Sequence, residues 1–208
     1  MRRKELTDKI LEHKIIAIIR TQHGETVPSL IQALYEGGIR VMEVTYNTPG
    51  CLEFVKEYHA YNDVLMGVGT VLSAEDVARS HEAGAQFFVS PIFSEALIRE
   101  SHRYDKPILC GAFSPTEIYQ AYAWGSDLVK VFPANDLGPS YLKGILAPMP
   151  MLPLAPTGGI HAGNTQEWLG AGAKALGVGS GLLPKALIET RDYGAITKLA
   201  QKMVTSLS

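Results

Sequence analysis

The chain has 208 residues, of which 46% are hydrophobic and 19% charged, and its formal net charge is −2. This is enough chain to bury a core in one large domain or two small ones. Balanced charge without a long basic block argues against nucleic-acid binding. No apolar run approaches the roughly 20 residues of a membrane helix, and the first 14 residues are too polar for a signal peptide. Two cysteines cannot build a disulfide framework, so we expect a soluble cytoplasmic protein without nucleic-acid or membrane partners.

A polar segment opens the chain, and eight short apolar, β-branched runs follow it. Residues 1–14 carry Leu6, Ile10 and Leu11 at helical spacing, which predicts an extra N-terminal helix packed on the main domain. The apolar runs begin near Ile15, Arg40, Val64, Gln86, Pro107, Asp127, Leu152 and Lys174. A segment with helical spacing or capping signals follows each run, and the intervals of 20 to 25 residues each fit one βα unit.

Helix starts are marked by serines, at Ser73, Ser94 and Ser114. Alternating strands and helices indicate a parallel sheet, and eight units that close on themselves make a (β/α)8 TIM barrel over residues 15–208. An open, doubly wound sheet is the structural alternative. Against that alternative, no G-x-G-x-x-G motif opens a helix after the first strand.

Two charged residues interrupt apolar strands. Alternation places Glu43 on the face that Ile39, Val41 and Thr45 share, and Lys130 on the face of Leu128 and Phe132. Each charge alone fits a strand end that reaches water, or a structural ion pair. Together they indicate a site, because the second and sixth strands lie opposite each other in an eight-stranded ring.

This pair of residue types suits Schiff-base chemistry. A lysine in a confined apolar setting has its ammonium form disfavoured, so its amine can attack a carbonyl. A carboxylate nearby can then carry protons to and from the intermediates. We therefore expect Lys130 and Glu43 to support carbon–carbon bond cleavage next to a keto group.

Glycine-rich segments follow the seventh and eighth strands, at Pro156–Ile160 and Gly177–Gly181. Glycine lets backbone N–H groups approach an anion closely, and barrels commonly bind phosphate with these two loops. Turns that need positive φ are the alternative reading. Arg20, directly after the first strand, is predicted to complete a phosphate clamp or to pair with a carboxylate. Pro91 is expected to shape the same barrel mouth.

No histidine or cysteine pattern in the sequence has metal-ligand spacing, so no metal or other cofactor is expected.

The sequence resembles the 2-keto-3-deoxy-6-phosphogluconate and 4-hydroxy-2-oxoglutarate aldolases. The segments that carry the resemblance are GGIRVMEVTYNTP, GVGTV, FVSP, GAFSPTE, LVKVFPA, PTGGI and GVGSGL. The resemblance runs from about Ile15 to Leu183. It implies a metal-independent class I aldolase, a homotrimer, that acts on pyruvate and a phosphorylated keto-sugar acid.

Residue roles also follow from the resemblance. It implies that Lys130 is the Schiff-base lysine and Glu43 the acid/base, and that Arg20 binds a substrate anion. It also implies that Thr70 helps to position the pyruvyl part and that Gly158, Gly159, Gly179 and Ser180 supply the phosphate site. Pro91 and Thr157 are expected to bind the substrate because of their places at the barrel mouth.

One position departs from the family pattern. Many members carry arginine after EVTL, where it meets the substrate carboxylate, whereas this chain has Asn47. Asparagine can hydrogen-bond the substrate but offers no cationic fork, and it resembles the 2-keto-3-deoxy-6-phosphogalactonate branch. The galactonate epimer and 4-hydroxy-2-oxoglutarate therefore stay open as substrates.

Two alternatives lie outside the aldolases. One is a non-catalytic barrel that binds a phosphorylated metabolite, and the other is another phosphate-dependent barrel enzyme, such as a thiamin phosphate synthase.

Overall fold

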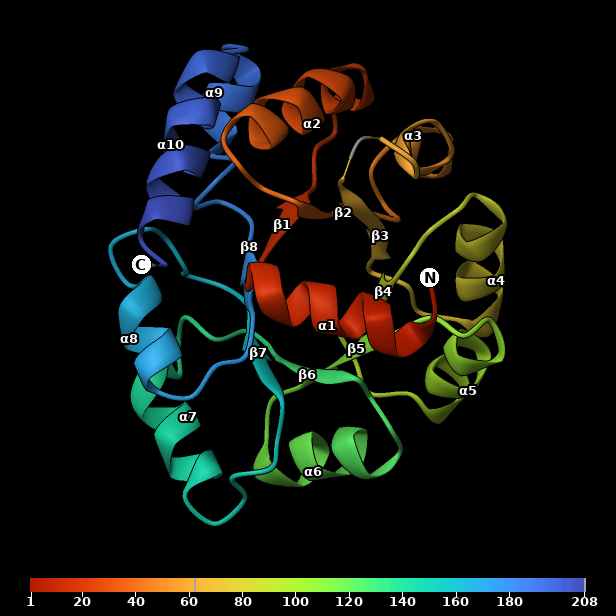
Figure 1. Cartoon of the computed structure of the whole chain (residues 1–208), viewed down its shortest axis with the longest axis vertical. Helices are drawn as coiled ribbons and strands as arrows, with labels where there is room; N and C mark the ends of the chain where they lie inside the picture. The colour runs from red at the N-terminus through yellow and green to blue at the C-terminus, as the bar shows by residue number, and fades with distance from the viewer. Residues whose placement is uncertain (62, 208) are drawn as a thin grey trace.

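The computed structural model describes residues 1–61 and 63–207, and within them the chain folds as a (β/α)8 barrel (Figure 1). The strands are β1 (Ile15–Ile19), β2 (Val41–Thr45), β3 (Leu65–Gly69), β4 (Phe88–Val89), β5 (Ile108–Ala112), β6 (Leu128–Val131), β7 (Leu154–Pro156) and β8 (Leu176–Val178). The helices are α1 (Arg3–His13), α2 (Val27–Glu36), α3 (Cys51–Tyr58), α4 (Ala74–Glu82), α5 (Glu95–Arg103), α6 (Pro115–Ala123), α7 (Gly138–Leu146), α8 (Thr165–Gly170), α9 (Lys185–Glu189) and α10 (Tyr193–Thr205), with a 3-10 turn η1 (Gly24–Thr26).

The strands form a nearly closed ring. Their order is β7-β6-β5-β4-β3-β2-β1-β8, and the pairs are parallel. A bridge between Thr157 and Gly177 joins the two ends of the sheet. Each strand begins within two residues of its predicted start, and the ring confirms the barrel over the open sheet.

Side-chain caps fix two of the predicted helix starts. Ser73 and Ser114 each form a capping box, with Asp76 and Glu117 as the partners at the third helical position. Ser94 also precedes its helix, but its hydroxyl makes no capping bond.

The amino end of the barrel interior is filled with apolar side chains and covered by α1. Leu6 and Ile10 of α1 are fully buried against inward-facing residues of the strands, which include Val41 and Leu128. Figure 1 shows α1 lying across this end of the ring. Asp127, directly before β6, anchors the helix, because its Oδ1 forms an ion pair with Arg3 and accepts a hydrogen bond from Thr7 Oγ1. The interior is therefore open to ligands from its other end.

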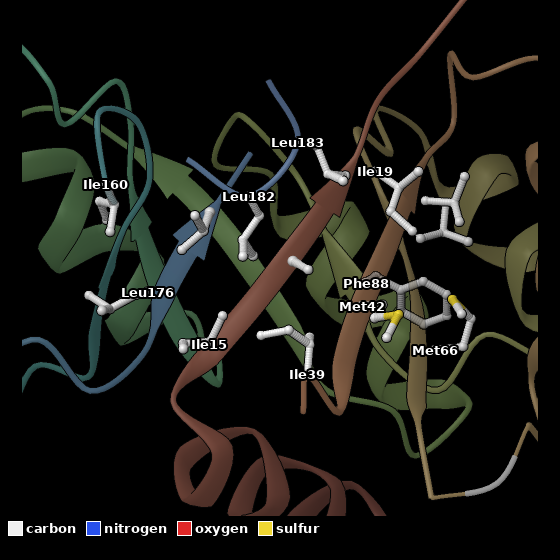
Figure 2. Packing of buried hydrophobic residues seen from close by; sticks show 14 of the residues in the cluster. Ile15, Ile19, Ile39, Met42, Met66, Phe88, Ile160, Leu176, Leu182 and Leu183 are labelled. Atoms are coloured by element: carbon white, nitrogen blue, oxygen red, sulfur yellow. The ribbon is translucent and has the colours of Figure 1, made fainter. Parts of the chain in front are cut away.

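A second apolar layer packs the outer faces of the strands against the helices. Figure 2 shows part of it, with Ile15 and Ile19 of β1 beside Met42 of β2 and Leu176 of β8. Ile39 belongs to this outer layer, so its predicted place on the Glu43 face was wrong. The reason is that β2 begins at Val41, and strand alternation does not extend back to Ile39.

No helix in residues 1–61 and 63–207 is both long enough and apolar enough to cross a membrane. Both cysteines are buried and carry free thiols.

Candidate active site

A cavity of about 470 Å³ opens at the carboxyl ends of the strands. Ten of the eleven predicted site residues line it: Arg20, Glu43, Thr70, Pro91, Lys130, Thr157, Gly158, Gly159, Gly179 and Ser180. They come from β2, β6 and the loops after β1, β3, β4, β7 and β8. Ring closure thus brings residues that are far apart in the sequence around one cavity.

Lys130 lies on β6, two residues beyond the buried Leu128 on the same strand face. Its side chain is 7% exposed, and its Nζ lies 4.9 Å from the centre of the Phe132 ring. Burial lowers the pKa of Lys130, the Glu43 carboxylate opposes this effect, and the Arg20 charge adds to it. A lowered pKa increases the fraction of neutral amine, which is the nucleophilic form.

Glu43 occupies the corresponding layer of β2, two residues beyond Val41. It is 1% exposed, and its Oε2 has no hydrogen-bond partner among the described residues. Burial raises its pKa from 4.5 to about 7, against the opposing effects of Lys130 and Arg20. Near neutral pH the carboxyl therefore exists in both protonation states, as a group that must both donate and accept protons requires.

Gly69 makes the space that the Glu43 carboxyl occupies. A Cβ at position 69 would lie 2.5 Å from Glu43 Oε1 and 2.7 Å from its Cδ. Contacts this short do not occur between non-bonded atoms of these types. Glycine at the end of β3 thus leaves the space in which the β2 carboxyl lies, and a side chain there would displace that carboxyl.

Three threonines connect β2 to the loop after β1. Thr45 lines the cavity, and its Oγ1 lies 3.0 Å from Oγ1 of the buried Thr48. The Thr21 backbone N–H donates to Thr48 Oγ1 at 3.5 Å, and Thr21 Oγ1 accepts a bond from the backbone N–H of His23 at 3.0 Å. This network positions the loop that follows Arg20.

The glycine loops serve two purposes. Gly158 and Gly159 have φ of 112° and 70°, so both need glycine for their backbone conformation. Gly177 leaves room for Thr157, because a Cβ there would lie 2.2 Å from Thr157 Oγ1. Gly179 has no positive φ, and within 4 Å of a Cβ there the described residues would place only Ile18 Cβ, at 4.0 Å. The turn requirement therefore explains the first pair but not Gly179, whose backbone borders open cavity.

Asn47 is the predicted site residue that the structure does not bring to the cavity. Its side chain is exposed on the loop after β2, and it is absent from the cavity lining. Alternation ends with β2 at Thr45, so the direction of the loop decides where Asn47 lies. Arg20 lines the cavity and acts on the pKa of both Lys130 and Glu43.

Several residues that we did not predict as site residues also line the cavity: Thr45, Phe132, Gln22, His23, Lys185 and Glu189. Alternation already placed Thr45 on the strand face of Glu43 and Phe132 on that of Lys130, so this signal was available. No sequence pattern marked Lys185 or Glu189, the first and last residues of α9, which follows the loop after β8. The described residues hold no group of three or more His, Cys, Asp or Glu side chains placed to share a metal ion.

Comparisons with known proteins give one consistent result. A family described as "Aldolase: KDPG and KHG aldolase" matches residues 6–199, a span that includes the whole cavity lining. A 2-dehydro-3-deoxy-phosphogluconate aldolase of Treponema pallidum is 36% identical over 191 residues, which are 91% of each chain. A KHG/KDPG aldolase of Escherichia coli is 31% identical over 192 residues, covering 91% of this chain and 90% of the relative.

Solved structures agree with this. A KDPG aldolase from Legionella pneumophila, with pyruvate captured at low pH as a covalent carbinolamine intermediate, matches with a TM-score of 0.86 and 29% identity. The match covers 95% of this chain and 97% of that one. The likeness therefore extends over the barrel and the loops that form its cavity.

Proposed function

Because this chain belongs to the KDPG and KHG aldolase family, we propose that it is a class I aldolase. Its reaction is the reversible cleavage of 2-keto-3-deoxy-6-phosphogluconate into pyruvate and glyceraldehyde 3-phosphate. The observation that carries the proposal is a buried lysine and a buried carboxyl, Lys130 and Glu43, on opposite strands of one cavity. Their pKa values are shifted in the directions that favour the neutral amine and the protonated acid.

The reaction begins when the Lys130 amine attacks the C2 ketone and forms a carbinolamine. Glu43 donates a proton to the departing hydroxyl, so water leaves and a protonated Schiff base remains. The Glu43 carboxylate then removes the C4 hydroxyl proton, directly or through a water. The C3–C4 bond breaks, its electrons move to the iminium nitrogen, and the aldehyde departs. The resulting enamine takes a proton at C3, and hydrolysis releases pyruvate and the free lysine.

Anion recognition divides between the two ends of the substrate. Arg20 takes the carboxylate next to the Schiff base, because its charge acts on both Lys130 and Glu43 while Asn47 lies outside the cavity. Thr70, Pro91 and Thr157 surround the pyruvyl end and the carbon chain.

The phosphate group lies at the loops after β7 and β8, against Gly158, Gly159, Gly179 and Ser180. Open space beside Gly179 lets an anion reach the backbone there. The same cavity can accept the phosphogalactonate epimer or 4-hydroxy-2-oxoglutarate, which differ from the proposed substrate in C4 configuration and in the distal anion.

A pyruvate assay coupled to lactate dehydrogenase tests the proposal. We expect the turnover rate with 2-keto-3-deoxy-6-phosphogluconate to exceed the rates with its C4 epimer and with 4-hydroxy-2-oxoglutarate. A chelator should leave this rate unchanged. Lys130→Met should abolish turnover. In the unaltered protein, borohydride should reduce the Schiff base formed with pyruvate and leave a carboxyethyl group on the Lys130 amine. No pyruvate from any substrate would instead favour a non-catalytic binding barrel.

We also propose that the protein is a cytoplasmic homotrimer. In support, three large apolar side chains, Leu72, Ile92 and Phe113, are about half exposed on the adjacent loops after β3, β4 and β5. Exposed apolar side chains on neighbouring loops are typical of protein interfaces. Light scattering after size-exclusion chromatography should give three times the monomer mass. A monomeric mass at micromolar concentration would contradict the assignment.

A further inference from the structure

Two opposite charges on α9 lie at the rim of the cavity, beside the glycine loops. Lys185 begins this helix and Glu189 ends it, and both line the cavity together with Gly159 and Ser180. The Lys185 Nζ lies 3.6 Å from Glu189 Oε1. The lysine side chain is 89% exposed and the glutamate 51%. Neither residue takes part in the chemistry at Lys130.

Fold stability does not explain this pair. Exposed ion pairs at i,i+4 contribute little to folding, since water competes for both charges. Lysine carries its charge on a flexible four-carbon stem and is free to exchange one anionic partner for another. A ligand anion in the cavity would therefore compete with Glu189 for the same ammonium group.

We propose that Lys185 and Glu189 tune the preference for a distal phosphate on the substrate, with Lys185 attracting the dianion and Glu189 opposing it. The inference rests on the proposed function, in which the phosphate lies at the loops after β7 and β8. A phosphate ester carries close to two negative charges near neutral pH. The two side chains then act in opposite directions on the same group, and uncharged aldehydes sense neither.

The aldol condensation separates this effect from the chemistry, because the acceptor can be changed while pyruvate stays the same. We would measure KM for glyceraldehyde 3-phosphate and for uncharged glyceraldehyde with Lys185→Met and Glu189→Gln. Exposed charge contacts are each worth about 0.2–1 kcal/mol, which corresponds to about a 1.4- to 5-fold change in binding. Lys185→Met should raise KM for the phosphorylated aldehyde by such a factor, and Glu189→Gln should lower it.

Both variants should keep the KM for glyceraldehyde and for pyruvate. Matched controls are Lys143→Met on α7 and Glu12→Gln on α1, two exposed charges outside the cavity that should change neither aldehyde's KM. About 0.5 M salt should shrink the two effects, since it screens exposed charges.

Changes of the same sign in both variants, or equal changes for the two aldehydes, would overturn the inference. So would an unchanged KM for the phosphorylated aldehyde. Borohydride trapping of pyruvate in each variant distinguishes the sources of failure. Normal trapping with an unchanged KM refutes only the role of the charge pair. An unaltered protein that does not trap pyruvate refutes the proposed function and, with it, this inference.

Discussion

The substitution Gly69→Ala tests whether the position of the Glu43 carboxyl controls turnover. The added methyl would lie 2.5 Å from Glu43 Oε1, where ordinary contacts begin near 3.4 Å. The carboxyl must therefore retreat by about 0.9 Å, the difference between these two distances. Misplacement of a reacting group by about 1 Å can reduce a rate roughly 100-fold.

We expect kcat in the coupled pyruvate assay to fall by about two orders of magnitude in Gly69→Ala. Overpacking should also reduce the free energy of unfolding by about 1–3 kcal/mol, so the variant remains foldable. Gly170→Ala is the matched control, because a Cβ there meets nothing within 4 Å among residues 1–61 and 63–207 and its φ is not positive.

A kcat within threefold of the unaltered protein would refute the reasoning, since it would mean that the carboxyl is not needed where it lies. If Gly69→Ala fails to fold, Glu43→Gln tests the same point without steric change. That variant keeps the side-chain shape but removes the proton-transferring group, and we expect at least as large a loss of kcat.

Three further predictions concern pH, hydroxyl bonding and helix stability. Because folding raises the pKa of Glu43 from 4.5 to about 7, the carboxyl destabilises the fold as pH rises through this window. In a Lys130→Met background, no lysine charge titrates together with Glu43. There Glu43→Gln should leave the urea-unfolding free energy unchanged at about pH 3, below both pKa values, and raise it by at least roughly 3 kcal/mol at about pH 8. The same difference between the two variants at both pH values would contradict the pKa shift. Thr48→Val should raise the substrate KM severalfold with a smaller effect on kcat, because it removes the hydroxyl that holds the loop after Arg20. Thr48→Ser keeps a hydroxyl and should restore the KM of the unaltered protein. Equal KM values for the valine and serine variants would exclude a role of the Thr48 hydroxyl in substrate binding. Gly144→Ala, in the exposed part of α7, should raise the unfolding free energy by about 0.5–1 kcal/mol, and a loss in the same urea titration would contradict the helical propensity argument.

The local pattern of the sequence was sufficient to predict the barrel and the inner-face placement of the two central residues. Strand alternation is a property of the backbone, so Glu43 shares a strand face with Val41, and Lys130 shares one with Leu128, wherever the strands are placed. Regular spacing of eight strands then requires them to lie on opposite sides of the ring. The capping boxes at Ser73 and Ser114 are also local, because each closes within four residues.

Only the tertiary structure decided the rim of the cavity. Asn47 turns outward and Lys185 reaches the cavity because loop direction depends on packing beyond the strand, where no periodicity constrains the side chain. The space for Glu43 likewise comes from Gly69 on a neighbouring strand, a requirement visible only once β2 and β3 are paired in register. Periodicity fixes which face of a strand a residue occupies, whereas distances between side chains on different elements follow from how the ring closes.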